Sequence, residues 1–292
     1  MKHKNKDRKQ NDQIFTGSAF LAAFIAVLAA MLLMTARPAE AKPASFRYEY
    51  GVFLGANTDD IPRMEAYHII VVDAMYFSKK QIRQLKRRGH VVYSYLNIGS
   101  LETFRSYFEE FEPYTLDPYA HWYDEYWMDV SKKKWQDRII KEAAKLKKKG
   151  VDGLFVDNTD VYYYYHTDAI YRGLTVMLKA FQKQGHYVFL NSGDNYVKEY
   201  LRHHKKLDII DGVNEETVFS KIHWDEGTFG TNGAEEKRFF QDYCALVQKN
   251  GGDVYLLEYT SDKSLKKKIK KYCKKKGYRY YITDNLDLDV AD

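Results

Sequence analysis

The sequence predicts a (β/α)8 barrel, the TIM-barrel fold, formed by a single domain. Short apolar or aromatic runs recur along the chain, and helical stretches lie between most of them. A recurring unit also joins a helix through a glycine to the next strand. Alternating strands and helices produce a parallel sheet covered by helices. Eight strands in roughly 240 residues are typical of the closed barrel.

The expected strands are rich in Val, Ile, Tyr, Phe and Leu, which favour extended structure. The competing fold is an open doubly wound sheet, which usually has fewer strands and often a glycine-rich nucleotide-binding turn. The sequence contains no G-x-G-x-x-G motif and no P-loop, so the barrel is favoured. The eight strands are Arg47–Leu54, His68–Asp73, His90–Asn97, Gly153–Asp157, His186–Asn191, Ile209–Asn214, Asp253–Glu258 and Tyr278–Thr283.

The expected helices share start and stop signals. In Ser78–Gly89, a serine stands at the N-cap and a glycine ends the helix. The segment from Gly99 to Asp129 is too long for a plain turn between strand and helix. On a barrel it follows the third strand at the catalytic end, so we expect it to build a wall of the cleft. The other helices are Ser131–Gly150, Thr167–Gly185, Ala234–Gly251 and Ser261–Gly277.

The amino terminus has the features of a secretory signal peptide. Residues 2–13 are polar and basic, an uncharged stretch of 21 residues runs from Ile14 to Met34, and Ala39-Glu40-Ala41 is an A-x-A site. We therefore expect residues 1–41 to be a signal peptide and residues 42–292 to be the barrel. The alternative is an uncleaved membrane anchor through Ile14–Met34, which is long enough to span a bilayer. Either reading predicts an extracellular barrel, secreted or anchored at the outer face of the membrane.

The composition is that of a globular protein, with 45% hydrophobic and 29% charged residues. The formal net charge is +6, and half of it lies in the first 41 residues. The lysine runs lie in or beside helical patterns, where solvated helix faces explain them, so we expect no nucleic-acid partner.

The two cysteines, Cys244 and Cys273, are too few for a disulfide framework; they are buried thiols or form one disulfide bond. We expect a monomer.

Aromatic residues make up 16% of the chain, with 26 tyrosines. Flat rings with polar tips suit ligands such as sugars, although core packing explains most single tyrosines. Barrel enzymes carry their reactive groups at the carboxyl ends of strands. Here those ends carry carboxylates and amides with few cations, which suits a hydroxyl-rich or cationic ligand. The residues concerned are Asp73, Tyr95, Asn97, Asp157, Asp160, Asn191, Asp194, Asn214, Glu215, Glu216, Glu258, Tyr259 and Asp284.

Two carboxylates across a cleft can cleave a glycosidic bond. Asp157 directly ends an apolar run, and Glu215 or Glu216 ends the sixth strand. An aspartate after a strand can instead cap the next helix, an alternative that is strongest for Asp160, Asp194 and Asp284. The sequence has no H-E-x-x-H motif and no G-x-S-x-G elbow, which disfavours metal and serine catalysis. We expect no metal and no cofactor.

Three runs resemble the endo-α-1,4-polygalactosaminidase type of glycoside hydrolase, glycoside hydrolase family 114. They are Tyr93–Glu102, Gly153–Asp160 and Asp211–Phe219, and the resemblance extends from about Tyr48 to Asp284. Two positions depart from the family pattern. Ser100 follows Gly99 where glutamate is common, and Glu258 precedes Tyr259 where aspartate is commoner.

The resemblance implies a TIM barrel that cuts galactosamine-containing exopolysaccharides of biofilms and cell surfaces. It also implies that Asp157 is the nucleophile and Glu216 the acid/base. We expect the substrate-binding side chains to be Asp73, Tyr95, Asn97, Asp160, Asn191, Glu258, Tyr259, Trp122 and Trp127. The alternatives to a hydrolase are a barrel that binds cell-wall or capsule glycan without cutting it, and a structural role at the membrane.

Overall fold

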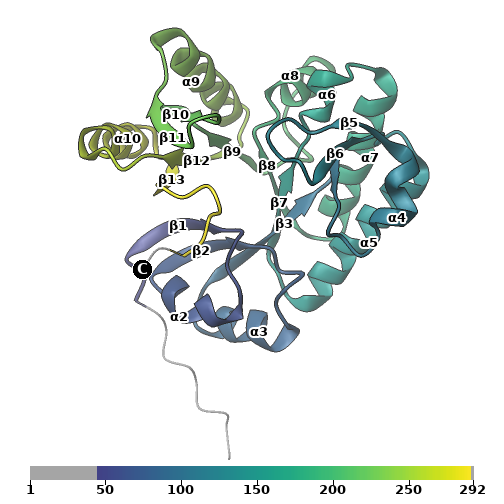
Figure 1. Ribbon diagram of the computed structural model, residues 1–292, viewed down its shortest axis with the longest axis horizontal. Helices are drawn as coiled ribbons and strands as arrows, with labels where there is room; N and C mark the ends of the chain where they lie inside the picture. Colours follow the sequence, from purple (N-terminus) through teal and green to yellow (C-terminus); the bar gives the residue numbers. More distant parts are fainter. Residues whose placement is uncertain (1–44, 291–292) are drawn as a thin grey trace, which may run out of the picture. The chain divides into compact units, whose positions relative to one another are not determined.

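The computed structural model describes residues 45–290 and confirms the predicted architecture of parallel strands surrounded by helices (Figure 1). Eight parallel strands form one sheet in the order β1-β2-β3-β7-β8-β9-β12-β13. The barrel is nearly closed: the ring of Phe53 on β1 lies 5.3 Å from that of Tyr281 on β13. The strands are β1 (Tyr48–Phe53), β2 (Tyr67–Val72), β3 (Val91–Asn97), β7 (Gly153–Asp157), β8 (Tyr187–Asn191), β9 (Gly212–Glu216), β12 (Asp253–Tyr259) and β13 (Arg279–Thr283).

The long helices begin and end at the predicted signals. Ser78 accepts a hydrogen bond from the backbone amide of Gln81 and forms a capping box at the start of α3. Gly150 ends α5 with φ 115°, a conformation that side chains disfavour. The helices are α2 (Ile61–Met64), α3 (Lys79–Arg87), α4 (Phe108–Phe111), α5 (Lys133–Lys149), α6 (Val161–Tyr164), α7 (Asp168–Lys183), α8 (Asp194–His203), α9 (Ala234–Lys249) and α10 (Lys263–Lys276), with 3-10 turns η1 (Thr58–Asp60) and η2 (Glu112–Tyr114).

The bounds of the sixth strand differ from the predicted ones. The expected range is Ile209–Asn214, but the strand runs from Gly212 to Glu216, and helix α8 precedes it where none is expected. The reason is the Asp211 carboxylate, which accepts a hydrogen bond from the Val188 backbone amide 2.7 Å away. This amide of β8 is then not available to pair with a backbone carbonyl of the residues before Asp211. Glu216 consequently lies on the strand itself instead of beyond its end.

Two connections carry additional strands. The segment after β3 contains β4 (Ser100–Glu102), β5 (Thr115–Pro118) and β6 (Glu125–Met128), which pair antiparallel as a small sheet. The connection after β9 contains the hairpin of β10 (Ser220–His223) and β11 (Thr228–Thr231). Side chains from both connections line the cavity described below, so the first forms a wall of the cleft as expected.

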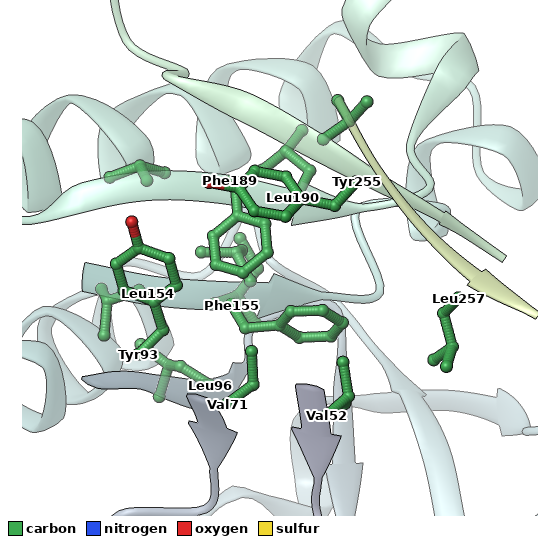
Figure 2. Packing of buried hydrophobic residues seen from close by; sticks show 14 of the residues in the cluster. Val52, Val71, Tyr93, Leu96, Leu154, Phe155, Phe189, Leu190, Tyr255 and Leu257 are labelled. Atoms are coloured by element: carbon green, nitrogen blue, oxygen red, sulfur yellow. The ribbon is translucent and has the colours of Figure 1, made fainter. Parts of the chain in front are cut away.

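The barrel interior is filled by aromatic rings (Figure 2). Phe155 and Phe189 meet edge to face at 5.0 Å, Phe189 lies 5.1 Å from Tyr255, and Tyr255 lies 4.8 Å from Tyr50. Burying one such ring stabilises the fold by about 1.5–3 kcal/mol. Many of the abundant aromatic residues therefore build the core, which also includes residues of the insertion after β3 such as Phe111 and Trp127.

The two cysteines, Cys244 and Cys273, are free buried thiols. No helix within residues 45–290 is long and apolar enough to cross a bilayer. The signal peptide or anchor predicted for residues 1–41, including Ile14–Met34, lies outside the described residues.

Candidate active site

A cavity of about 860 Å³ opens at the carboxyl ends of the barrel strands. Among the residues described, its lining contains Arg105 and Lys221 as the only cationic side chains. Carboxylates are far more numerous there, although the whole chain carries a net charge of +6. The cavity is therefore an acidic site on a basic protein. Its carboxylates belong to Asp73, Glu102, Asp124, Glu125, Asp157, Asp160, Glu216, Glu236 and Asp287.

Asp157 and Glu216 meet in this cavity through Asn191. The Asn191 side-chain nitrogen donates to Asp157 Oδ1 at 3.1 Å and to Glu216 Oε1 at 2.7 Å. These two carboxylate oxygens are therefore no more than about 5.8 Å apart. The three residues end β7, β8 and β9, which are neighbours in the sheet. The barrel thus brings together two carboxylates and one amide that are distant in sequence.

Strand alternation decides between Glu215 and Glu216. Side chains of successive strand residues point to opposite faces. Glu216 lines the cavity and accepts a hydrogen bond from the Tyr259 hydroxyl at 2.8 Å. Glu215 is buried on the other face, where its partner is the Ser192 hydroxyl at 3.5 Å, and it does not line the cavity.

Both carboxyls of the pair have raised pKa values. Burial, followed by the negative charge of Glu216, raises the pKa of Asp157 to about 7. Burial also raises the pKa of Glu216, opposed by its hydrogen bonds with Asn191 and Tyr259. Carboxyls this close titrate as a coupled pair, so their two protons are lost at different pH values. One ionised and one protonated carboxyl is the state that glycoside cleavage requires.

The chain is strained directly after each of these three residues. Asn158, Ser192 and Thr217 have φ values of 63°, 57° and 54°. This left-handed conformation is unusual for serine and a genuine outlier for a β-branched threonine, costing about 1–3 kcal/mol. The Thr217 amide donates to the Leu257 carbonyl at 2.9 Å, which helps to hold the turn. The strain lies where β7, β8 and β9 present their polar ends to the cavity.

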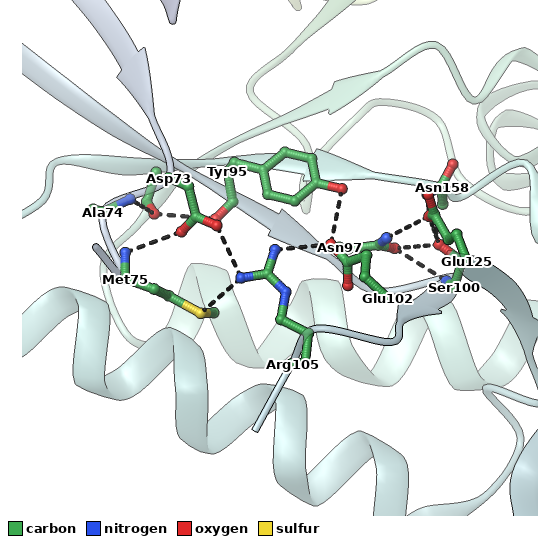
Figure 3. Close-up of polar contacts among 11 residues, drawn as sticks. Asp73, Ala74, Met75, Tyr95, Asn97, Ser100, Glu102, Arg105, Glu125 and Asn158 are labelled. Atoms are coloured by element: carbon green, nitrogen blue, oxygen red, sulfur yellow. Dashed lines mark hydrogen bonds and ion pairs between the residues drawn. The ribbon is translucent and has the colours of Figure 1, made fainter. Parts of the chain in front are cut away.

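Asp73 is held by Arg105 from the insertion after β3 (Figure 3). Arg105 donates to Asp73 and to Glu102, each at 2.8 Å, and all three are buried. Tyr95 donates its hydroxyl to Glu102 at 3.4 Å and lies beside the same guanidinium. Burial raises the pKa of Asp73 although Arg105 opposes it. Asp73 and Tyr95 do line the cavity, but the Asp73 charge is already compensated.

Glu125 is a site residue that the sequence prediction missed (Figure 3). It lines the cavity and accepts hydrogen bonds from the side-chain nitrogens of Asn97 and Asn158, both at 2.8 Å, and from the Ser100 hydroxyl. Burial, together with the charges of Glu102 and Asp157, raises its pKa to about 7. Its position on β6, in the long insertion, gave no local signal. Asn97 was expected to bind substrate but is buried behind Glu125 and does not line the cavity.

Glu258 was also expected to touch substrate, but it lies outside the cavity lining. It is fully buried, and its carboxylate accepts the backbone amides of Phe219 and Ser220 at 2.8–3.1 Å and the Ser220 hydroxyl at 2.7 Å. The Ser220 hydroxyl oxygen in turn accepts the Tyr259 amide at 3.0 Å. Glu258 therefore holds the segment that follows Glu216 instead of a ligand.

The two predicted tryptophans occupy different environments. Trp122 is partly exposed and lines the cavity. Trp127 is buried and stacks 4.4 Å behind Tyr119, which itself lines the cavity, so Trp127 supports the wall without reaching the interior.

Of the three aspartates for which a capping role was considered, Asp160 alone lines the cavity. It stands at the start of α6 without a side-chain capping bond. Burial, followed by the charge of Asp157, raises the pKa of Asp160 to about 7. Asp194 pairs with Lys198 at 2.5 Å instead. Across residues 45–290, no group of three or more His, Cys, Asp or Glu side chains has an arrangement suited to a metal ion.

The sequence model of glycoside-hydrolase family GH114 matches residues 32–291. The chain belongs to this family. It is therefore a glycoside hydrolase, and the acidic cavity at the strand ends is in the place where barrel enzymes carry their active sites. No curated protein sequence matched the chain.

Solved structures of glycosidases share the fold of this GH114 member. The glycoside hydrolase domain of PelA from Pseudomonas aeruginosa has a TM-score of 0.71 at 16% identity, covering 82% of this chain and 96% of that domain. Ega3 of Aspergillus fumigatus, solved in complex with galactosamine, has a TM-score of 0.64 at 16% identity, covering 87% and 96%. An α-galactosidase from Thermus thermophilus has a TM-score of 0.56 at 9% identity, covering 84% and 58%. At these identities the likeness concerns the fold.

Proposed function

We propose that this GH114 protein cleaves a galactosamine-containing polysaccharide internally and with retention of anomeric configuration. The observation that carries the proposal is the pair Asp157 and Glu216, joined by one Asn191 amide. Carboxyl groups lie about 5–5.5 Å apart in retaining enzymes and about 6.5–9.5 Å apart in inverting ones. Oxygens no more than about 5.8 Å apart support the retaining arrangement.

In the first step, an Asp157 oxygen attacks the anomeric carbon and the glycosidic C–O bond breaks. Glu216 gives its proton to the leaving oxygen, so a covalent glycosyl–enzyme forms and the shortened chain departs. In the second step Glu216 takes a proton from water, and the resulting hydroxyl displaces Asp157 from the sugar. The Tyr259 hydroxyl and the Asn191 amide orient Glu216 through both steps.

The acidic lining supports an amino-sugar substrate. Deacetylated galactosamine carries a positive charge near neutral pH, and the cavity presents carboxylates with few cations. Within residues 45–290, no ion pair involves Asp160 or Glu125, so both carboxylates are available to meet an ammonium group in the cavity that they line. Ega3, a structure of similar fold, was solved with galactosamine bound, which agrees with this substrate class.

Export remains part of the proposal. Such polymers lie outside the cell, and the pattern of residues 1–41 is that of a signal peptide or an anchor. A mature protein in the medium that begins at Lys42 would establish cleavage. Recovery of the chain in the membrane fraction would favour the anchor through Ile14–Met34.

The experiment uses residues 42–292, the barrel with its own core, and a panel of partly deacetylated galactosamine and glucosamine polymers. We expect new reducing ends with the wild type and a loss of at least about a thousandfold in kcat for Asp157→Asn and Glu216→Gln. The anomer first released, followed by NMR, reports the stereochemistry. Full activity of either variant would disprove the assignment. Binding of a polymer without cleavage would make the protein a glycan-binding barrel.

A further inference from the structure

We propose that two aromatic platforms, on opposite sides of the cavity mouth, bind sugar units on either side of the cleaved bond. The first platform is formed by Tyr76 and Phe104, and the second by Trp122 and Trp224. The inference rests on the proposed function for the identity of the ligand and adds where its outer units are held. Each of the four side chains lines the cavity and is exposed by between 39% and 60%.

The order of strands places the platforms opposite each other. Tyr76 follows β2, and Trp224 lies in the turn of the hairpin that follows β9. Three strands, β3, β7 and β8, separate β2 from β9 in one direction around the barrel, and three strands, β12, β13 and β1, separate them in the other. Tyr76 and Trp224 therefore leave opposite sides of the barrel, with Asp157 and Glu216 in the same cavity. Phe104 and Trp122 both belong to the insertion after β3. Arg105, next to Phe104, contacts Met75 beside Tyr76, whereas Trp122 contacts Trp224.

The first platform is backed by the buried arginine. The Arg105 guanidinium carbon lies 5.0 Å from the centre of the Phe104 ring. Arg105 also donates to the sulfur of Met75 at 3.3 Å, and Met75 directly precedes Tyr76. Asp73 and Glu102 fix this guanidinium, so the Phe104 ring and the Met75 side chain pack against a group that is held in place. Tyr76 and Phe104 nevertheless remain more than half exposed at the cavity that they line.

The second platform is assembled by two different connections of the barrel. The His121 ring stacks on Trp224 at 4.9 Å with an interplanar angle of 4°, and Trp122 meets Trp224 edge to face at 6.1 Å. His121 and Trp122 belong to the insertion after β3, whereas Trp224 belongs to the hairpin after β9. The contact holds the hairpin turn against the insertion, so the indole faces are positioned before any ligand arrives.

Aromatic faces of this kind fit an amino-sugar chain. A sugar ring has an apolar face that a flat ring can cover, and a protonated amine is attracted to the ring face by cation–π interaction. Platforms on both sides favour a long chain that crosses the mouth over a short one that fills only the centre. We therefore expect affinity to increase with chain length.

The test measures binding in a Glu216→Gln background, so that no cleavage interferes, by calorimetry with α-1,4-linked galactosamine oligomers of three and nine sugar units. We expect the longer oligomer to bind at least about tenfold more tightly. We expect Phe104→Ala or Trp224→Ala each to weaken binding of the longer oligomer by about five- to thirtyfold. This range corresponds to the loss of one cation–π contact, from a solvent-exposed one at the low end to a desolvated one at the high end. Binding of the shorter oligomer should change less than about twofold.

The matched control is Tyr123→Ala, because Tyr123 is 96% exposed beside Trp122 yet does not line the cavity. It should leave both affinities unchanged. Equal affinity for the two oligomers, equal losses for both in the platform variants, or no binding of either oligomer would overturn the platforms. Length-dependent binding that the platform variants reduce, in a wild type that cleaves nothing, would instead refute the hydrolase proposal and leave the platforms standing.

Discussion

At the scale of single residues, Asn191 links the two carboxylates of the proposed mechanism. Its side-chain nitrogen donates to both of them, and hydrogen bonds to a carboxylate favour the charged form. These bonds oppose the effect of burial, which raises the pKa values of Asp157 and Glu216. Asn191 therefore opposes the rise of both pKa values and lowers the pH at which the two carboxyls ionise.

Replacing Asn191 should move the acid limb of the pH profile. The wild type should show a bell-shaped dependence of kcat/KM, because activity needs one ionised and one protonated carboxyl. In Asn191→Ala the ionised form loses a donor, so the acid limb should move upward by about half to one pH unit, with kcat lowered about tenfold or more. Initial rates between pH 4 and 9 measure this. Asn250→Ala, an amide at the end of α9, is the control, and an unmoved acid limb in Asn191→Ala would contradict the role.

At the scale of elements, β12 supports the end of β9. Glu258 on β12 binds the amides of Phe219 and Ser220, and Ser220 in turn accepts the Tyr259 amide. We call this set of bonds from Glu258 to Phe219 and Ser220 the Glu258 clamp. The strained Thr217 lies between Glu216 and the clamp. A fully buried carboxylate is therefore used to fix a turn that begins directly after the acid/base of the proposed mechanism.

Removing the clamp should affect stability and turnover together. Glu258→Ala leaves the two amides without an acceptor, so we expect the free energy of unfolding to fall by about 2–4 kcal/mol. We also expect kcat to fall more than KM rises, because Glu216 loses its position. Glu258→Gln keeps an acceptor oxygen and should recover part of both losses. Urea unfolding and steady-state kinetics measure the two effects, and wild-type kcat in a folded Glu258→Ala protein would show that the turn does not position Glu216.

At the scale of the whole molecule, the barrel concentrates carboxyls whose pKa values are raised by burial. The pKa values of Asp157, Asp160, Glu125 and Glu258 are each raised to about 7. In the unfolded chain the same groups titrate near pH 4. Between about pH 4 and pH 7 these four groups bind more protons in the folded protein than in the unfolded chain, so their contribution to stability falls as pH rises. Burial lowers the pKa values of His90 and His186, which act in the opposite direction.

The thermal midpoint should accordingly decrease between pH 5 and pH 8. The stabilisation that these carboxyls provide is fully present below their unfolded pKa and is lost as pH rises through their folded pKa. Asp160→Asn removes one of them and should make the decrease shallower, whereas Asp137→Asn, at an exposed helix position, should not. Calorimetry at several pH values tests this, and the same pH dependence of the midpoint in Asp160→Asn and the wild type would exclude a raised pKa of Asp160.

Local patterns in the chain were sufficient to predict the alternation of strands and helices, most helix ends and the strand that presents Asp157. These features depend on side-chain patterns and caps within a few residues, such as Ser78 and Gly150. The resemblance of three short runs also indicated the family. Short-range signals therefore predicted the fold and Asp157, and the resemblance named Glu216 as its partner.

The rest of the site depends on the folded arrangement of the chain. The packing of the barrel places Glu258 and Trp127 behind the surface of the cavity, although both were expected to bind substrate. Folding also brings Arg105 to Asp73 and Trp224 to His121 from separate connections. The physical reason is that each of these outcomes depends on contacts between residues that are far apart in the chain, which no local pattern encodes.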